Sequence, residues 1–204
     1  MKNQDATIHI IDDDQSMQKY LSELVETMNF KSKTYNSASD FLQNYTDDGL
    51  GCLVLDLRLP GISGLELHQQ LAGNNIDLPV IMISGFGDVS TAVKAMKAGV
   101  LDFLEKPFHG QDLLDLIISA VKKHKTDREK NNSQIEALQC FNSLTQREKE
   151  VMEYVVAGTL NKDIAKKLEI SIKTVEVHRA NVMEKMKVSS VPDLVRASLI
   201  ANEK

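Results

Sequence analysis

One stretch of this chain decides its fold: Cys52-Leu-Val-Leu-Asp56-Leu-Arg58-Leu-Pro60-Gly61-Ile-Ser-Gly64. The apolar run 52–55 is typical of a buried strand, which delivers Asp56 to its carboxyl end. Proline and glycine follow at once and indicate a loop. In open parallel sheets, ligands bind at the carboxyl ends of the strands. The stretch therefore predicts a parallel sheet with a functional carboxylate at one edge.

The rest of residues 1–120 alternates between short apolar runs and helical periods. Strands are predicted at 7–11, 31–35, 52–55, 79–84 and 101–105, and helices at 16–28, 64–71, 89–98 and 111–123. A further helix follows Ser37 and Asp40, which resemble a capping box. Five strand–helix repeats predict an α/β fold with a five-stranded, doubly wound parallel sheet.

Other charged residues follow strands of the same predicted sheet. Asp12 and Asp13 follow the first strand, and Lys106 follows the fifth. Carboxylates gathered at one edge repel each other without a cation, and hard oxygen ligands beside a phosphoryl group favour Mg²⁺. Lys106 and the hydroxyl of Ser84, at the end of the fourth strand, are expected to contact phosphoryl oxygens. Asp56 is then a candidate for phosphorylation; the alternative is a salt-bridged acidic rim without metal.

The length of the chain and the distribution of its charges favour two domains, of which the second is the candidate for binding nucleic acid. The 204 residues are long for one domain, and 42% are hydrophobic. Residues 1–124 carry 10 Lys/Arg against 17 Asp/Glu, whereas residues 142–204 carry 11 against 9. The second segment is therefore the candidate for nucleic acid, although its charge alone is weak support. With no apolar signal region or membrane span, and with Cys52 and Cys140 expected as free thiols, a cytoplasmic location without membrane contact is predicted.

The strand pattern ends before residue 142. Residues 125–141 are polar and predict a solvated helix or a mobile linker. Thr145 and Glu148 form a capping box that opens a helix ending near Gly158. Three more helices are predicted at 161–168, 172–186 and 191–201, with a tight turn at 169–171. An all-α domain of four helices with this turn is typical of a helix-turn-helix. The predicted domains are 1–124, a helical linker at 125–141, and 142–204.

The first segment resembles the receiver domain of two-component response regulators. The resemblance rests on Ile-Ile-Asp12-Asp13-Asp14, Leu-Val-Leu-Asp56-Leu-Arg-Leu-Pro-Gly-Ile-Ser-Gly64, Ile-Ser84-Gly-Phe-Gly-Asp and Asp102-Phe103-Leu-Glu-Lys106-Pro107. It implies a flavodoxin-like fold, phosphorylation of Asp56 by a sensor histidine kinase, and a cis peptide bond before Pro107. It also implies that Asp12, Asp13, Asp56 and the backbone carbonyl of Arg58 hold Mg²⁺, and that Ser84 and Phe103 form a switch.

Receivers remove their own phosphoryl group by in-line attack of water. The positions two residues after the phosphoacceptor and after the hydroxyl residue line the path of that water. Here they are Arg58 and Phe86, and neither is expected to position the water well. The resemblance therefore predicts a long-lived phosphorylated form and, beyond slow self-dephosphorylation, no enzymatic activity.

Residues 140–202 resemble the LuxR-type helix-turn-helix, and the two domains together resemble the NarL/FixJ family, with Val-Glu-Val-His178-Arg-Ala-Asn-Val-Met closest to FixJ. Helical spacing predicts that Val175, His178, Val182 and Met186 face inward. The DNA-binding candidates are Lys162, Lys173, Thr174, Glu176, Val177, His178, Arg179, Ala180, Asn181 and Lys185. Glu176 is expected to accept from a cytosine amino group, and Val177 or Ala180 to touch a thymine methyl. Lys162, Thr174, Arg179, Asn181 and Lys185 are candidate phosphate contacts.

The predicted function is a phosphorylation-switched transcription regulator that binds double-stranded promoter DNA. Phosphorylation is expected to promote a homodimer through residues 89–123, and RNA polymerase is an expected partner. Two alternatives stay open. An Asp-nucleophile phosphatase of the haloacid-dehalogenase type would want a second acid two residues after Asp56, where this chain has Arg58. A ligand-sensing LuxR regulator would need an apolar pocket in place of the acidic site.

Overall fold

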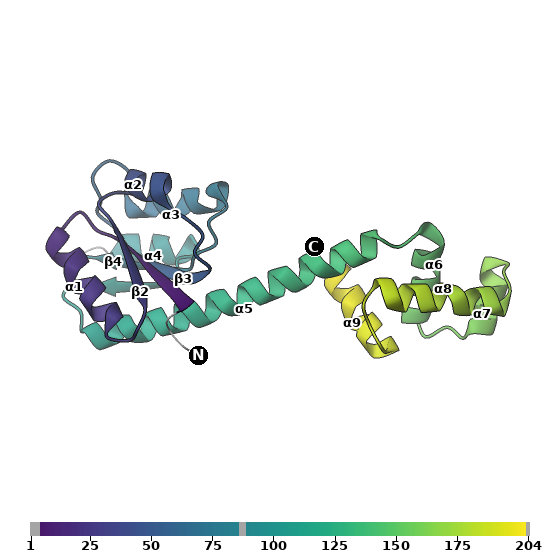
Figure 1. The fold of residues 1–204 in the computed structure, drawn as a ribbon. Helices are drawn as coiled ribbons and strands as arrows, with labels where there is room; N and C mark the ends of the chain where they lie inside the picture. Colours follow the sequence, from purple (N-terminus) through teal and green to yellow (C-terminus); the bar gives the residue numbers. More distant parts are fainter. Residues whose placement is uncertain (1–4, 86–88, 203–204) are drawn as a thin grey trace. The chain divides into compact units, whose positions relative to one another are not determined.

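The computed structural model describes residues 5–85 and 89–202 (Figure 1). The chain divides into two compact units, Met1–Asp127 and Arg128–Lys204. Within the described residues, no helix combines the length and the hydropathy that crossing a bilayer requires.

The first unit contains one parallel sheet of five strands in the order β2-β1-β3-β4-β5. The strands are β1 Ala6–Ile11, β2 Lys31–Tyr35, β3 Leu50–Asp56, β4 Val80–Ser84 and β5 Asp102–Glu105. The helices of this unit are α1 Gln15–Glu26, α2 Ala38–Asn44, α3 Gly64–Leu71, α4 Val89–Lys97 and the first part of α5 Gly110–Asn142, with a 3₁₀ turn η2 at Ala72–Asn74. This order is flavodoxin-like, so the prediction of a doubly wound parallel sheet is confirmed.

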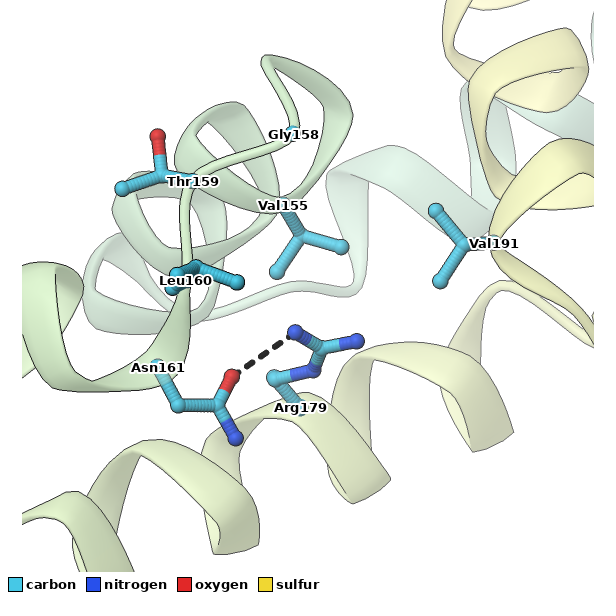
Figure 2. A pocket seen from close by; sticks show the side chains of 7 residues that line it. All are labelled: Val155, Gly158, Thr159, Leu160, Asn161, Arg179 and Val191. Atoms are coloured by element: carbon cyan, nitrogen blue, oxygen red, sulfur yellow. Dashed lines mark hydrogen bonds between the residues drawn. The ribbon is translucent and has the colours of Figure 1, made fainter.

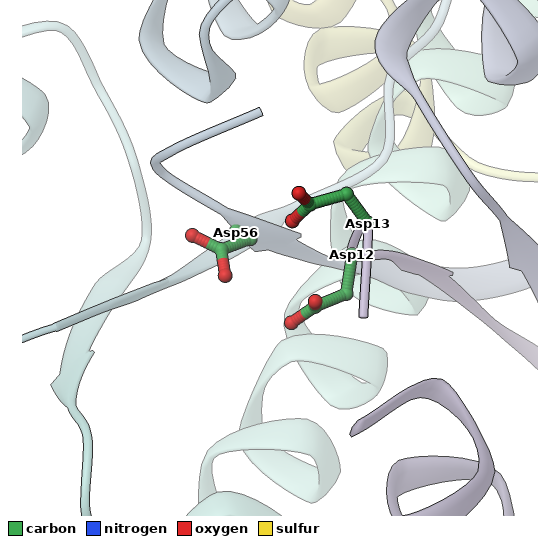
Figure 3. Close-up of side chains that lie close together, drawn as sticks. All are labelled: Asp12, Asp13 and Asp56. Carbon is green, nitrogen blue, oxygen red and sulfur yellow. The ribbon is translucent and has the colours of Figure 1, made fainter. Parts of the chain in front are cut away.

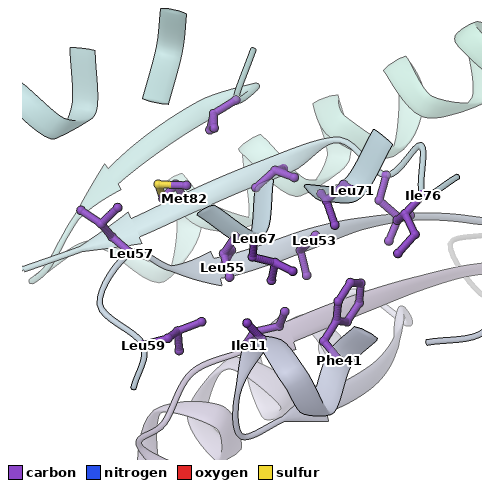
Figure 4. Packing of buried hydrophobic residues seen from close by; sticks show 14 of the residues in the cluster. Ile11, Phe41, Leu53, Leu55, Leu57, Leu59, Leu67, Leu71, Ile76 and Met82 are labelled. Carbon is purple, nitrogen blue, oxygen red and sulfur yellow. The ribbon is translucent and has the colours of Figure 1, made fainter. Parts of the chain in front are cut away.

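Two hydrophobic clusters cover the two faces of the sheet. Leu53 and Leu55 of β3 pack into one cluster with α2 and α3 (Figure 4), whereas Cys52 and Val54 pack into the other with α1 and α5. Successive side chains of a strand point to opposite faces, so both faces of β3 are buried. This is why its sequence reads as a continuous apolar run.

Helix α5 is longer than the predicted helix at 111–123. It runs without interruption from Gly110 to Asn142, and residues from Arg128 onward belong to the second unit. Residues 125–141 were predicted to form either a solvated helix or a mobile linker, and the structure shows a helix. The segment 111–142 contains no proline or glycine that would end a helix.

The second unit is helical. Its other helices are α6 Gln146–Val156, α7 Asn161–Leu168, α8 Ile172–Lys185 and α9 Val191–Asn202. Val151, Ile164, Val175 and Leu194, one from each of these helices, are buried in a common core. The capping box of Thr145 and Glu148 is present as predicted.

Gly51 is a point of close backbone approach between strands. Opposite Thr7 in the sheet, it has no room for a side chain, because a Cβ atom there would lie 2.1 Å from the Thr7 carbonyl oxygen. The buried imidazole of His124 lies on the same residue, with Nδ1 at 3.1 Å from the Gly51 nitrogen and 2.9 Å from its oxygen. Gly51 therefore joins β1, β3 and α5.

We expect Gly51→Ala to lower the free energy of unfolding by at least about 2 kcal/mol, because the added methyl group forces β1 and β3 apart. Chemical denaturation followed by circular dichroism measures this. The matched control is Gly73→Ala in η2, where a Cβ atom meets nothing within 4 Å, so a change within about 0.5 kcal/mol is expected. Equal stability of both variants would contradict the packing described.

Candidate functional sites

The acidic site lies at the carboxyl edge of the sheet, where β1 and β3 are neighbours. Asp12 follows the last residue of β1, and Asp56 is the last residue of β3. Asp12, Asp13 and Asp56 each offer a carboxylate oxygen, and these oxygens all lie within 4.8 Å of one another (Figure 3). Asp12 and Asp56 are buried, whereas Asp13 is exposed. The structure therefore brings together the three acids that the sequence singled out.

Lys106 reaches the same group of acids from the end of β5. Its Nζ atom donates to Asp12 Oδ2 at 2.9 Å and to Asp56 Oδ2 at 2.5 Å. Its backbone amide donates to the carbonyl of Ser84 at 2.7 Å, which fixes it beside β4. The peptide bond from Lys106 to Pro107 is cis, as the resemblance predicted.

The pKa shifts at this site reflect burial and the hydrogen bonds between Lys106 and the two buried acids. Burial raises the pKa of Asp12, the charge of Asp56 adds to the rise, and hydrogen bonds from Asp14 and Lys106 oppose it. Burial works against the charge of Lys106, but its hydrogen bonds to Asp56 and Asp12 outweigh burial and raise the pKa of the lysine. Three ionised carboxylates beside one ammonium leave a formal charge of −2. A divalent cation with oxygen ligands, such as Mg²⁺, fits this donor set.

The Asp56 carboxylate is held on both sides. Its Oδ1 atom accepts from the backbone amide of Arg58 at 2.8 Å, while Oδ2 accepts from Lys106. The start of α3 presses against the same residue, because a Cβ atom on Gly64 would lie 2.3 Å from the Asp56 carbonyl oxygen. The side chain of Arg58 is exposed. The loop after β3 thus fixes the orientation of the carboxylate.

The two predicted switch residues lie on neighbouring strands. Ser84 ends β4 and is fully buried, with Oγ donating to the Gly85 carbonyl at 3.3 Å. Phe103 of β5 pairs with Met82 of β4 and packs, partly buried, against the cluster on the α2–α3 face. Phe86, the other residue expected on the water path, lies outside the described residues.

One buried polar residue beside the site was missed by the sequence analysis. Gln18 of α1 is 8% exposed and donates to the main chain of Asp12. A signal for it exists in the sequence. Gln18 shares the helical spacing of Leu21 and Val25, which are buried, so it is a polar residue at an inward position.

In the second unit, α7 and α8 form the helix-turn-helix. Glu169, in the tight turn predicted at 169–171, adopts the left-handed conformation, with φ of 54°. Arg147 of α6 donates to the Leu168 carbonyl at 3.1 Å and so satisfies one open carbonyl at the end of α7. Ser171 caps α8 by accepting from the amide of Thr174 at 3.0 Å.

Helix α8 has a buried and an exposed side, as its sequence predicts. Val175, Val182 and Met186 are buried. His178 is half-buried, and its Nδ1 atom has no hydrogen-bond partner among the described residues. The exposed residues on the other side are Lys173, Glu176, Val177 and Ala180.

Two of the five candidate phosphate contacts, Arg179 and Lys185, form hydrogen bonds with residues of other helices. Arg179 is four residues after Val175 and therefore lies on the same face of α8 as this buried residue. Its Nη1 atom donates to Asn161 Oδ1 at 2.8 Å, and both residues line a pocket of about 600 Å³ (Figure 2). Lys185 donates to Glu148 Oε2 at 2.7 Å. This bond, with that from the Thr145 amide, lowers the pKa of Glu148 to about 2. Of the other three, Lys162 and Thr174 are exposed, the Thr174 hydroxyl lies 2.8 Å from Ser171 Oγ, and Asn181 is half-buried.

An acidic site at this sheet edge, followed by a helix-turn-helix, defines a response regulator that acts on DNA. Residues 8–118 match the response regulator receiver domain, and residues 142–198 match the bacterial regulatory proteins of the luxR family. Among curated proteins, the response regulator protein TmoT of Ectopseudomonas mendocina is 45% identical, with 97% of this chain and 90% of TmoT covered. The transcriptional regulatory protein FixJ of Rhizobium meliloti is 44% identical, with 96% of each chain covered.

Solved structures agree with these matches. The response regulator StyR is 39% identical with a TM-score of 0.87, covering 96% of this chain and 98% of that one. Full-length FixJ from B. japonicum is 37% identical with a TM-score of 0.59, covering 96% of each. The chain belongs to the NarL/FixJ family of response regulators. It is a phosphorylation-dependent transcription regulator, its domains imply a histidine kinase and DNA as partners, and nothing in the comparisons supports the phosphatase alternative.

Proposed function

We propose that Asp56 accepts a phosphoryl group from a histidine kinase, and that this event controls how the chain binds promoter DNA. The observation that carries the proposal is the convergence of three carboxylates within 4.8 Å at the sheet edge, bridged by Lys106. An oxygen of Asp56 attacks phosphorus, the phosphorus–nitrogen bond of the kinase phosphohistidine breaks, and the imidazole takes up a proton.

The chain's own residues prepare this step. The Arg58 amide and Lys106 hold the Asp56 carboxylate in one orientation before the phosphoryl group arrives, which is the positioning that phosphoryl transfer requires. Asp12, Asp13, Asp56 and the Arg58 carbonyl would hold Mg²⁺, which offsets the repulsion between carboxylate and phosphoryl group. Lys106 and Ser84 then contact phosphoryl oxygens, and Phe103 follows the movement of Ser84.

Phosphorylation is proposed to produce a homodimer through α4, β5 and α5. Val93 and Met96 on α4 are 49% and 47% exposed, and Ile118 on α5 is 40% exposed. Exposed apolar side chains on neighbouring elements support an interaction surface there.

We retain residues 1–124, 125–141 and 142–204 as the functional division. RNA polymerase is the proposed partner at the promoter, and the bacterial cytoplasm, where promoter DNA lies, the proposed location.

The DNA-binding residues keep the predicted roles. Lys173, Glu176, Val177 and Ala180 would enter the major groove, and Lys162, Thr174, His178 and Asn181 would contact the backbone. Arg179 and Lys185 remain in the proposal, although each would have to leave or share an internal partner to reach a phosphate.

With Mg²⁺ and beryllofluoride, we expect the wild-type chain to dimerise in sedimentation and to bind promoter DNA at least about 10-fold more tightly, since two copies add their binding energies. Asp56→Asn keeps the side-chain shape but offers no nucleophile, so neither change should occur. Asp5→Asn, an exposed acid before β1, is the matched control and should behave as wild type. Phosphoryl mass on another residue after acetyl phosphate, or DNA affinity indifferent to it, would contradict the proposal.

We also propose a long-lived phosphorylated form, because the exposed Arg58 side chain has no hydrogen-bond acceptor to orient a water molecule for attack. Loss of the phosphoryl mass, followed by mass spectrometry with Mg²⁺ present, should take minutes or longer. Arg58→Asn places an amide near the water path and should accelerate the loss several-fold. A wild-type half-life of seconds would show the proposal to be wrong.

If Glu176 reads a cytosine, Glu176→Gln should erase one preferred base position in selections from random double-stranded DNA, at a cost of about 1–3 kcal/mol on the original site. Glu184→Gln, an exposed acid later on α8, is the control and should keep the preference. Were Glu176 only a solvated charge, its removal would strengthen binding to all sequences alike and leave the base preference unchanged.

A further inference from the structure

Gln18 is a buried polar residue on the core-facing side of α1. It is 8% exposed and shares that side with Leu21 and Val25, which are 1% and 0% exposed. A carboxamide in such a place costs free energy unless its groups are hydrogen-bonded. Its contacts therefore indicate what it is for.

Its Nε2 atom lies within hydrogen-bond distance of three acceptors at the carboxyl edge of the sheet. These are the Asp12 carbonyl at 2.6 Å, Asn36 Oδ1 at 3.0 Å and the Tyr35 carbonyl at 3.2 Å. The shortest contact is to the peptide group that joins Asp12 to Asp13. That peptide fixes the direction in which both acids leave the backbone.

The sheet ladder no longer holds this peptide. The last paired residues of β1 and β2 are Ile11 and Tyr35, and the next bond, from the Asp12 amide to the Tyr35 carbonyl, is stretched to 3.4 Å. Beyond it the two chains separate toward α1 and α2. At the point where β1 and β2 separate, the Asp12 carbonyl therefore accepts a hydrogen bond from the side chain of Gln18.

Further hydrogen bonds close a ring through the first turn of α1. The Asp14 amide donates to Asp12 Oδ1 at 2.9 Å, and Asp14 Oδ1 caps the helix by accepting from the Ser16 amide at 2.8 Å. The backbone amide of Gln18 donates to the Asp14 carbonyl at 3.0 Å. The side chain and the carbonyl of Asp12 are thus both tied to the start of α1.

We propose that Gln18 is a positioning residue for the metal and phosphoryl site: it holds the Asp12–Asp13 peptide so that both carboxylates converge on Asp56. The inference rests on the function proposed for Asp56. Residues that orient metal ligands typically account for a 10- to 100-fold change in metal affinity when they are replaced. Gln18 acts through the backbone, so a loss of about 10-fold is expected.

The test is Mg²⁺ affinity, measured by isothermal titration calorimetry on the full chain at a temperature where every variant is folded. Gln18→Met keeps the length of the side chain and removes its donors, and should weaken Mg²⁺ binding by about 10-fold. Gln18→Leu also removes both donors and adds no charge beside the acids; it should show a similar loss, and it serves alone if Gln18→Met does not fold. Beryllofluoride binding, followed by fluorine NMR, should weaken in parallel.

Two controls separate positioning from general destabilisation. Gln15→Met changes an exposed residue of the same helix, and Ile117→Ala removes buried contacts of α5 in the cluster that packs on α1. Both should leave Mg²⁺ affinity within about twofold of wild type, although Ile117→Ala lowers stability. Mg²⁺ affinity of the folded Gln18 variants within twofold of wild type would overturn the inference. Absence of Mg²⁺ binding by the wild type would instead overturn the function proposed for the site.

Discussion

Three like charges are held together in this protein, and the rest of the first unit depends on that constraint. The carboxylates of Asp12, Asp13 and Asp56 have oxygens within 4.8 Å of one another, and two of the three are buried. Lys106 offsets part of their repulsion, while burial, with a smaller contribution from the charge of Asp56, raises the pKa of Asp12. Such a cluster persists only where the backbone imposes it, which is what the buried strands β1 and β3 and the close approach of Gly64 to Asp56 do. A site built this way favours any added ligand that brings positive charge and accepts a fixed geometry.

Sequence alone predicted the acidic site because parallel topology leaves little freedom. Once residues 52–55 are taken as a buried strand, Asp56 must lie at a carboxyl end, and Asp12 and Lys106 follow by the same logic. The tight turn at 169–171 and the buried side of α8 were likewise predictable from local patterns. The partners of Gln18, Arg179 and Lys185 were not, because each lies on another element. No local pattern tells that Lys185 meets Glu148, 37 residues away, and so both cations were assigned to DNA. The extent of α5 could not be predicted, for a different reason. A polar composition indicates that a segment is exposed to solvent, but it does not determine whether the backbone is helical.

The internal use of cations bears on how the second unit meets DNA. Residues 142–204 carry a formal charge of only +2, and Arg179 and Lys185 are engaged with Asn161 and Glu148. Non-specific binding depends on lysines and arginines that neutralise phosphates. Because Lys185 is paired with Glu148 and Arg179 is bonded to Asn161, one copy of this unit would make a small electrostatic contribution to binding DNA of any sequence. Discrimination would then rest on the proposed base-edge contacts from few side chains, among them Val177, which is 53% exposed.

Weak binding by one copy would make the switch proposed at Asp56 effective. A domain that gripped DNA tightly alone would occupy its site whatever the state of the receiver, so phosphorylation would change little. Where each copy contributes a modest free energy, joining two copies raises occupancy steeply, because the second contact becomes intramolecular. The ion pair between Lys185 and Glu148, which competes with phosphate for Lys185, joins α6 to the end of α8. The Lys185–Glu148 ion pair would thus both stabilise the helix-turn-helix and limit its affinity for DNA. A positive charge added to strengthen DNA binding would make that binding less dependent on phosphorylation.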